Sequence, residues 1–415
     1  MGSNRRVVVT GLGAVTPLGI GIEQSWRSLC AGESGIDWVT RFDATGFRTR
    51  VSGEVKGFKS EDFLRDKLAR RTDRYQQFAL AAAEMALQHA GLRIKPDIAE
   101  SVGVDIASGV GGLETTVSGQ NMFMNGARSE LSPFFVPMFL VSMASAQVAM
   151  RFGAKGPNMT QCTACAAGTH AVGDAFRIVQ YGQADVMLAG GAEAPVVPVL
   201  YHSLGTIGAT TARSDDPKKA CRPFDADRDG FVPGEGAAVL ILEELEFALR
   251  RGAQIYAEIL GYGTTADAYH VTSPSPGGEG AARCMKLALK DAGLGASDID
   301  YINAHGTATK LNDATETAAF KKVFGTRAYS IPISSNKSML GHSFAASGAM
   351  EALFTVMTME RGIIPPTVNL ETPDPECDLD YVPNVARKAV VKQALSNSFG
   401  FGGTNGTLIF RKFEE

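Results

Sequence analysis

The residue of greatest chemical interest is Cys165, which lies in the run Thr163-Ala-Cys-Ala-Ala-Gly168 of small side chains. Good helix formers follow at 170–180, so this run is expected to precede a helix N-terminus. A thiol there faces unpaired backbone N–H groups and the positive end of the helix dipole, which favour the thiolate and can hold an oxyanion. A small buried cysteine that only fills space is the commoner alternative. Cys165 is therefore a candidate nucleophile that needs partners.

Two histidines in the second half of the chain are candidate partners. His305 ends an expected strand at 300–304 and is followed by Gly-Thr, and side chains at strand ends commonly enter active sites. His342 follows a glycine in a second turn. The chain has six histidines, so two in matching glycine-flanked turns suggest a function, although a turn histidine can also serve only as a cap. The glycine-rich segment 397–405, with two phenylalanines, indicates either a strand corner or close backbone approach to a ligand.

Composition limits the class of protein. With 415 residues the chain exceeds one ordinary domain of ~100–150 residues, which favours two domains or one duplicated fold. The net charge of -4 offers no general attraction for nucleic acid or an anionic membrane. No apolar run approaches the ~18 residues that span a bilayer, and the N-terminus begins a strand instead of a signal peptide. Six scattered cysteines indicate free thiols. We expect a cytoplasmic protein, or one of an organellar matrix if a transit peptide was removed.

The elements that must position these residues follow an alternating α/β pattern. Expected strands at 6–10, 102–107, 186–189, 239–242 and 302–304 are separated by Ala-rich amphipathic stretches such as 78–89. The segment 85–92 recurs as 287–294 with five of eight residues identical. In each half, a turn with a reactive side chain also opens an Ala/Gly-rich helix. We therefore predict two duplicated halves, residues 1–252 with the nucleophile and residues 253–415 with the histidines.

Three motifs imitate known sites. Gly11-Leu-Gly-Ala-Val-Thr16 follows a strand like a dinucleotide fingerprint, but threonine replaces the third glycine and a proline comes next. The segment 225–230 imitates the start of a calcium loop, yet its twelfth position is Gly236, and a turn with structural carboxylates is the better interpretation. Cys162 and Cys165 have redox or zinc spacing without a second ligand pair nearby. The polar segments 121–135 and 206–228 are expected to run over the surface.

The motifs together resemble one family. Its members are matched by Thr163-Ala-Cys165, Asn303-Ala-His-Gly-Thr307, Lys337-Ser-Met-Leu-Gly-His342 and Asn397-Ser-Phe-Gly-Phe-Gly-Gly-Thr-Asn405. In this order and spacing they resemble the β-ketoacyl-[acyl-carrier-protein] synthases, closest to the type II elongating enzymes. The resemblance implies an α/β thiolase-like fold, a duplicated five-layer α-β-α-β-α architecture. It also implies a decarboxylating Claisen condensation of acyl and malonyl groups carried by acyl carrier protein, in fatty-acid elongation.

The resemblance also implies roles for individual residues. Cys165 would take the acyl group, with the oxyanion held by the backbone N–H groups of Cys165 and Phe401. His305 and His342 would donate from Nε2 to the enolate formed as carbon dioxide leaves, and Lys337 would order the site by pairing with Glu351. No redox or organic cofactor is required. Supporting carboxylates are expected at Asp313 and Glu316. Substrate-binding residues are expected at Thr307 and Thr309 for pantetheine, at the gate Phe401 with Phe399, and in the acyl pocket at Val110, Phe135 and Leu204.

Partners follow from the same resemblance. A basic cluster, Lys67, Arg70, Arg71 and Arg74, suits an acidic acyl carrier protein, although a solvated helix face is the alternative. A homodimer is expected. A structural Na⁺ or K⁺ would be held by Asn303, Ala304, Glu351, Ser396 and Asn397. Neither nucleic acid nor a membrane is expected as a partner.

Some residues depart from the family pattern, and other classes compete. Ala166 replaces a usual Ser or Thr, Lys310 and Asn312 replace Pro and Gly, and Leu204 replaces a frequent phenylalanine. These changes leave the preferred acyl length open. A polyketide or specialised ketosynthase is the main alternative. A thiolase would need a second catalytic cysteine near the C-terminus, a chain-length factor would lack the nucleophile, and a dithiol redox protein would need Cys162.

Overall fold

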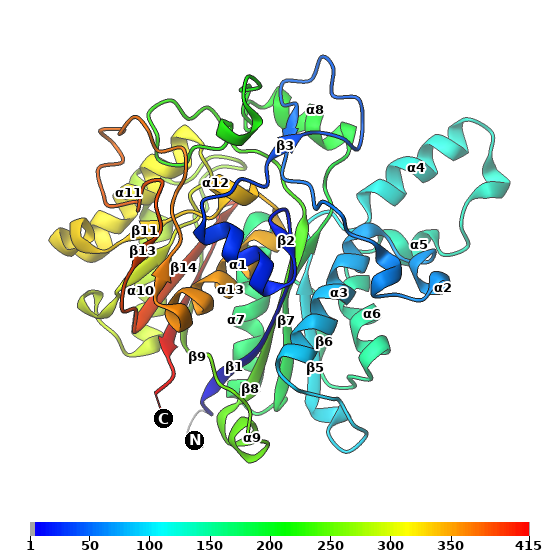
Figure 1. Cartoon of the computed structure of the whole chain (residues 1–415), viewed down its shortest axis with the longest axis horizontal. Helices are drawn as coiled ribbons and strands as arrows, with labels where there is room; N and C mark the ends of the chain where they lie inside the picture. The colour runs from blue at the N-terminus through cyan, green and yellow to red at the C-terminus, as the bar shows by residue number, and fades with distance from the viewer. Residues whose placement is uncertain (1–4, 415) are drawn as a thin grey trace.

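The computed structural model describes residues 5–414, and the outermost ends of the two predicted halves lie outside this range. Among the described residues, eleven strands form one mixed sheet: ten follow the order β11-β10-β14-β15-β9-β1-β8-β7-β5-β6, and β2 pairs with β1 off this path (Figure 1). These strands are β1 (Val7–Thr16), β2 (Gly19–Ile20), β5 (Val102–Ala107), β6 (Asn158–Met159), β7 (Val186–Glu193), β8 (Gly236–Glu244), β9 (Ala257–Ala266), β10 (Tyr301–Asn303), β11 (Ile333–Ser334), β14 (Gln393–Gly400) and β15 (Thr404–Lys412). Two small ribbons pair β3 (Asp37–Trp38) with β4 (Val51–Ser52) and β12 (Ile363–Ile364) with β13 (Arg387–Lys388).

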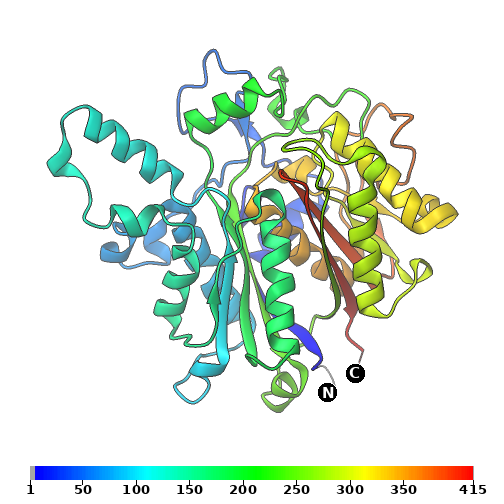
Figure 2. The same cartoon turned by 180° about the vertical axis from the view of Figure 1, so that it is seen from behind.

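The helices divide into a central pair and outer layers. They are α1 (Ile22–Cys30), α2 (Asp66–Ala69), α3 (Arg74–His89), α4 (Leu113–Met124), α5 (Phe135–Phe139), α6 (Met143–Phe152), α7 (Ala167–Gln180), α8 (Pro198–Thr206), α9 (Leu245–Arg250), α10 (Glu279–Ala292), α11 (Lys310–Phe324), α12 (Lys337–Leu340) and α13 (Ala345–Arg361). The central helices α7 and α13 pack on each other and on both halves of the sheet, while α3 and α6 cover one outer face and α10 and α11 the other (Figures 1 and 2). The chain thus has the five layers that were predicted.

Small residues allow the central helices to approach closely. A side chain at Gly168 of α7 would lie 2.4 Å from the carbonyl oxygen of Ala345 in α13. The α13 residues from Ala345 to Met359 are all buried. A helix that is apolar all round must lie in the interior, so its Ala/Gly-rich sequence explains its central position.

The two halves repeat one topology. The first half has the strand order β6-β5-β7-β8-β1 and the second has β11-β10-β14-β15-β9, with the halves joined where β1 pairs with β9. In both halves the pairs β5–β7 and β10–β14 are parallel and the next pairs are antiparallel. The repeated octapeptides end α3 and α10. We propose residue 252, in the turn between α9 and β9, as the division between the halves.

The sequence motifs that imitate other sites have structural roles here. Gly11 and Gly13 lie inside β1, where a side chain would come within 2.5 Å and 2.0 Å of backbone oxygens of α3. They serve strand–helix packing rather than phosphate binding. All six cysteines, which lie within residues 5–414, carry free thiols. In this same range no helix is both long and apolar enough to cross a bilayer.

The surface position predicted for 121–135 is confirmed where side chains are described, and that predicted for 206–228 is partly wrong. Residues 121–124 continue α4, which with α5 forms an arm that projects from the body of the chain (Figure 1). The segment 206–228 begins at the surface, but Phe224, Asp225 and Arg228 are buried. Part of the polarity of 206–228 belongs to the buried ion pairs of Arg222 and Arg228. Hydropathy alone cannot distinguish such buried charges from exposed ones.

Candidate active site

Cys165 lies in a 3₁₀ turn, Ala164–Ala166, that leads directly into α7. The preceding residue, Ala164, has φ of 51°, a left-handed conformation that a non-glycine residue adopts only under constraint. The thiol is 8% exposed. The backbone N–H groups of Cys165 and Phe401 both point at its sulfur. The helix begins at Ala167, three residues earlier than predicted, so the nucleophile lies directly before its N-cap, Ala166.

Burial changes the expected charge of the thiol. It raises the pKa of Cys165 to about 11, whereas the charge of Lys337 and the N–H groups of Phe401 and Cys165 lower it. The prediction that this position favours the thiolate is therefore wrong for the resting site, because desolvation outweighs the positive surroundings. The same N–H groups remain available to a developing oxyanion.

His305 stands where β10 ends, as predicted. Glu316 of α11 accepts hydrogen bonds of 2.9 Å from the backbone N–H groups of His305 and Gly306. The ammonium of Lys337 donates to the carbonyl oxygen of His305 at 2.6 Å and lies 3.3 Å from its Nδ1. Lys337 also forms a buried ion pair with Glu351. These contacts fix both the backbone and the ring of His305.

His342 lies between α12 and α13, with its ring centre 5.4 Å from that of His305. Its Nδ1 is 3.0 Å from the hydroxyl of Ser347, one turn into α13. The rings of Phe344 and Phe231 pack against it at 5.2 Å each. Both histidines are 2% exposed.

The two imidazoles are neutral donors. Burial and the nearby charge of Lys337 hold the pKa of both His305 and His342 well below the usual value. Because an ammonium can only donate, Nδ1 of His305 must accept from Lys337, and its proton is then on Nε2. The structure therefore supplies a physical reason for the predicted Nε2 donor of His305.

One cavity of about 370 Å³ joins most of the predicted site. Its walls include Cys165, Leu204, His305, Thr307, Thr309, His342, Phe399 and Phe401. The hydroxyls of Thr307 and Thr309 are 3.0 Å apart. Phe401 is 37% exposed, so the gate residue reaches the surface of the chain. A thiol, two imidazoles and two hydroxyls thus meet in a largely apolar space.

Other predicted residues lie elsewhere. Val110 and Phe135 are not part of that cavity: the N–H of Val110 bonds to Glu193, and Phe135 lines a separate pocket beside α4. Arg74 does not belong to a docking surface, because its guanidinium pairs with buried Glu235 and lies 4.5 Å from the ring centre of Phe78. The charge of Arg74 suggests a docking residue in the sequence, but in the structure this charge is paired with an internal carboxylate.

The rest of the basic cluster is accessible but remote from the cavity within one chain. Lys67 and Arg70 are exposed, and the guanidinium of Arg71 lies over the ring of Phe134 at 4.2 Å. None of them lines the cavity, and α2 lies on the side of the chain opposite to α10 and α11 (Figure 1).

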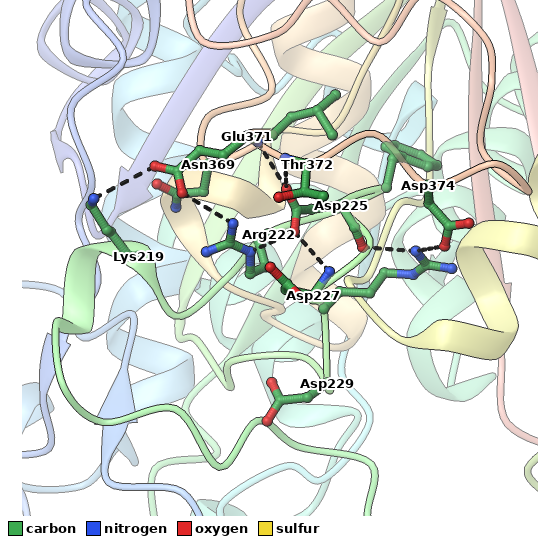
Figure 3. Close-up of polar contacts among 12 residues, drawn as sticks. Lys219, Arg222, Asp225, Asp227, Asp229, Asn369, Glu371, Thr372 and Asp374 are labelled. Atoms are coloured by element: carbon green, nitrogen blue, oxygen red, sulfur yellow. Dashed lines mark hydrogen bonds and ion pairs between the residues drawn. The ribbon is translucent and has the colours of Figure 1, made fainter.

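The calcium-like segment is a structural turn, as interpreted from the sequence. Asp225 accepts from Arg222 at 2.9 Å and from the backbone N–H groups of Asp227, Glu371 and Thr372 (Figure 3). These bonds join the loop to the segment 369–374.

Arg228 carries this network to the active site. Its side chain, 1% exposed, pairs with Asp374 and Asp313 and donates to the carbonyl oxygens of Thr309 and Lys310. The turn thereby supports the threonines of the cavity wall. Sequence reasoning missed Arg228 because a charged residue in a polar turn usually indicates exposure.

Comparisons with known proteins show the family of the chain. The β-ketoacyl synthase N-terminal domain matches residues 4–248 and the C-terminal domain matches residues 256–371. A 3-oxoacyl-[acyl-carrier-protein] synthase 2 of Synechocystis sp. is 52% identical over 410 residues, 99% of each chain. The protein of that name in Staphylococcus aureus (strain COL) is 47% identical over 416 residues, all of both chains.

Solved structures show the same fold. A β-ketoacyl synthase from Burkholderia phymatum STM815 has a TM-score of 0.92 with 37% identity and covers 99% of this chain and 100% of its own. A ketosynthase in complex with a type II PKS acyl-carrier protein and bound to the hexaketide has a TM-score of 0.92, 39% identity and the same coverage.

The fold and the site therefore define a condensing enzyme, and the chain belongs to the β-ketoacyl synthase family. Within that family it is an acyltransferase of the 3-oxoacyl synthase 2 type, which acts in fatty-acid chain elongation. The predicted recognition, fold class and reaction are confirmed.

Proposed function

We propose that Cys165 accepts an acyl group from acyl carrier protein and that His305 and His342 then direct its condensation with malonyl-carrier protein. One observation carries this assignment: a single cavity contains a buried thiol with two N–H groups aimed at its sulfur and two neutral imidazoles.

In the first half-reaction the Cys165 sulfur attacks the thioester carbonyl of the acyl-carrier protein. The carbon–sulfur bond to Cys165 forms, the bond to the carrier thiol breaks, and the thiol proton passes to the released carrier. The negative oxygen of the tetrahedral intermediate accepts from the N–H groups of Cys165 and Phe401. Donors set in place before the reaction stabilise this charge most effectively.

In the second half-reaction malonyl-carrier protein loses carbon dioxide. The resulting enolate oxygen accepts from Nε2 of His305 and His342, and its carbon attacks the acyl-Cys165 carbonyl. A carbon–carbon bond forms, the thiolate of Cys165 leaves, and a β-ketoacyl-carrier protein results. Neutral imidazoles donate without readily protonating the carbanion, and the apolar wall keeps water away.

The cavity wall positions the carrier arm. Thr307 and Thr309 offer hydroxyls to the pantetheine amides, Phe399 and Phe401 gate the acyl side, and Leu204 shapes it. Glu316 and Glu351 are supporting carboxylates because they bond to the backbone of His305 and to the ammonium of Lys337. Asp313 supports the cavity wall indirectly, through Arg228 and the backbone N–H of Phe224.

A homodimer would complete the acyl pocket. The α4–α5 arm exposes Met122, Met124, Val136 and Leu140, an apolar surface that a second copy would cover. Val110 and Phe135 would then line the far end of the acyl tunnel. We still propose that the carrier protein docks on the basic residues Lys67, Arg70 and Arg71.

A monovalent cation would fit behind the site. Asn303 Oδ1 and Ser396 Oγ are buried and have no hydrogen-bond partner among the described residues. Together with Ala304, Glu351 and Asn397 they would hold Na⁺ or K⁺ mainly through neutral oxygens, which suit a hard cation of low charge. The ion would keep β10 and β14 in place.

The bacterial relatives also support a cytoplasmic location.

Intact-mass measurements test the assignment. Wild-type protein is mixed with acyl-carrier proteins of graded chain length, then with malonyl-carrier protein. An acyl adduct on Cys165, absent in Cys165→Ala and discharged as a β-ketoacyl product, is expected. Transfer to Cys162, or product formation by Cys165→Ala, would contradict it. The length profile identifies the preferred acyl chain.

A further inference from the structure

His170 has no part in the reaction described so far, yet it touches both chain segments that supply the oxyanion donors. It lies on α7, one turn after Cys165, and is buried. Its Nδ1 is 2.6 Å from the hydroxyl of Thr163, and its Nε2 is 3.2 Å from the backbone carbonyl oxygen of Asn405. Thr163 precedes the Cys165 turn, and Asn405 follows the hairpin turn that carries Phe401.

The partners fix the tautomer of this imidazole. A carbonyl oxygen can only accept, so Nε2 of His170 carries the proton and donates to Asn405. Nδ1 of the neutral ring then accepts from the Thr163 hydroxyl. Burial holds the pKa of His170 below the usual value, which keeps the ring neutral. The hydroxyl of Thr264 in β9 also lies 3.4 Å from Nε2, so both ring nitrogens have partners, Nδ1 beside the Cys165 turn and Nε2 in β15 and β9.

Two glycines in the surrounding backbone leave room for the His170 ring and for the Thr163 carbonyl. A side chain at Gly406 would come within 3.1 Å of Nε2 of His170, and one at Gly400 would lie 3.0 Å from the carbonyl oxygen of Thr163. The hairpin of β14 and β15 therefore packs closely on α7 and the Cys165 turn (Figure 2). One further bond, from the Thr404 hydroxyl to the Thr163 carbonyl at 3.1 Å, joins the same segments.

The Cys165 turn needs such external support. Ala164 adopts a left-handed conformation without being glycine, so the turn does not maintain itself by local preference. The N–H groups of Cys165 and Phe401 come from opposite halves of the duplicated fold. Both N–H groups can point at one sulfur only if the two segments are held in a fixed relative position.

We propose that His170 is a positioning residue that clamps the Cys165 turn to the Phe401 hairpin and so aligns the two N–H donors of the oxyanion site. The inference rests on the proposed function of Cys165 and Phe401. It predicts that loss of the clamp impairs acyl transfer, which uses those donors, more than malonyl decarboxylation by the acyl-free enzyme, which uses His305 and His342.

The test compares His170→Phe with His89→Phe. His89 is a matched control because it is also a helix histidine bonded through both nitrogens, to the N–H of Leu12 and the hydroxyl of Tyr256, but it touches neither donor segment. For each folded variant, the rate of Cys165 acylation by acyl-carrier protein is measured by rapid-quench intact mass. The decarboxylation of malonyl-carrier protein is measured in the same preparation.

A loss of about 10- to 100-fold in acylation by His170→Phe is expected, as for other small misplacements of catalytic groups, with decarboxylation within about threefold of wild type. His89→Phe should leave the ratio of the two rates unchanged. Equal losses of both rates, or unchanged acylation, would overturn the proposal. If wild type itself forms no adduct on Cys165, the proposed function fails instead.

A second pair of variants covers the case in which His170→Phe does not fold. Thr163→Val removes the hydroxyl that His170 Nδ1 accepts from while preserving shape, and Thr163→Ser retains it. The clamp predicts a selective loss of acylation in Thr163→Val that Thr163→Ser largely restores. Equal acylation by the two variants would contradict it.

Discussion

At the scale of single residues, burial controls the chemistry of the site. It raises the pKa of the Cys165 thiol to about 11 and holds those of His305 and His342 well below their usual value. All three groups are consequently uncharged at neutral pH. The proton of Cys165 must leave during attack on the thioester, and the histidines act as hydrogen-bond donors rather than as acids.

The raised pKa of Cys165 therefore predicts how the reactivity of its thiol depends on pH. Below its pKa the thiolate fraction rises tenfold per pH unit, so alkylation of Cys165 by iodoacetamide should accelerate about tenfold for each unit between about pH 7 and 9. Peptide mass spectrometry of alkylated protein measures this rate, with Cys165→Ala as the blank and Cys162→Ser to exclude the neighbouring thiol. A rate that is constant across this range would show a preformed thiolate.

Substitutions in the buried pair of Lys337 and Glu351 are expected to change stability and condensation activity to different extents. Lys337→Met leaves the carboxylate of Glu351 without its partner and should lower the free energy of unfolding by about 3–5 kcal/mol. The double variant Lys337→Met/Glu351→Gln removes the unpaired charge and should recover part of that stability. It should not recover condensation, because nothing then holds the His305 tautomer. Denaturant unfolding and product assays measure both, and recovery of full activity would contradict the role of Lys337.

At the scale of elements, loops far apart in sequence support the cavity wall. The turn at Asp225 joins the segment 369–374 (Figure 3). Arg228 extends the network to the carbonyl oxygens of Thr309 and Lys310. The start of α11, with its pantetheine-binding threonines, is therefore held from outside by buried charges. A loop with four bonds on one carboxylate needs no metal ion.

The Asp225 turn predicts a contrast between two carboxylates of one loop. Asp225→Ala leaves buried donors unpaired and should lower the free energy of unfolding by about 2–4 kcal/mol while raising KM for malonyl-carrier protein. Asp227→Ala, at an exposed position, should change stability by less than about 0.5 kcal/mol. Thermal unfolding and steady-state kinetics check this. Equal effects, or stabilisation of wild type by added calcium, would contradict the structural interpretation.

At the scale of the whole molecule, the cavity of one chain lacks part of its expected wall. Val110 and Phe135 do not line it: the N–H of Val110 bonds to Glu193, and Phe135, in α5, borders a separate pocket beside α4. The arm also exposes apolar side chains that a monomer would leave in water. A second copy on this surface would explain both features.

This surface predicts the oligomeric state. Wild type should sediment as a dimer, and the double substitution Met124→Glu/Val136→Glu should give monomers, because two buried charges oppose association. Val390→Glu, at a position 81% exposed on another part of the chain, is the control and should remain dimeric. Sedimentation equilibrium distinguishes these states. A double variant that stays dimeric would place the interface elsewhere.

Much of the fold was predictable because its signals are local or repeated. Alternating strands and helices and the recurrence of 85–92 at 287–294 predicted a duplicated α/β chain, and spacing and residue type singled out Cys165, His305 and His342. The helix that follows Cys165 begins at Ala167, three residues before the predicted start, because the low helix preference of Gly168 and Thr169 hides its first turn in the sequence. The burial of Arg228 and the internal pairing of Arg74 were missed, since a sequence shows a charge but not its partner.

The sequence by itself determined the identity of the reacting groups, their order and the elements that carry them, because residue type and periodicity are properties of short segments. The tertiary structure alone decided their charge states, and it shows the contacts that hold the His305 tautomer and bring the Cys165 and Phe401 N–H groups to one sulfur. Those properties arise from desolvation and from contacts between residues far apart in the sequence. Such contacts exist only once the two halves have packed around α7 and α13.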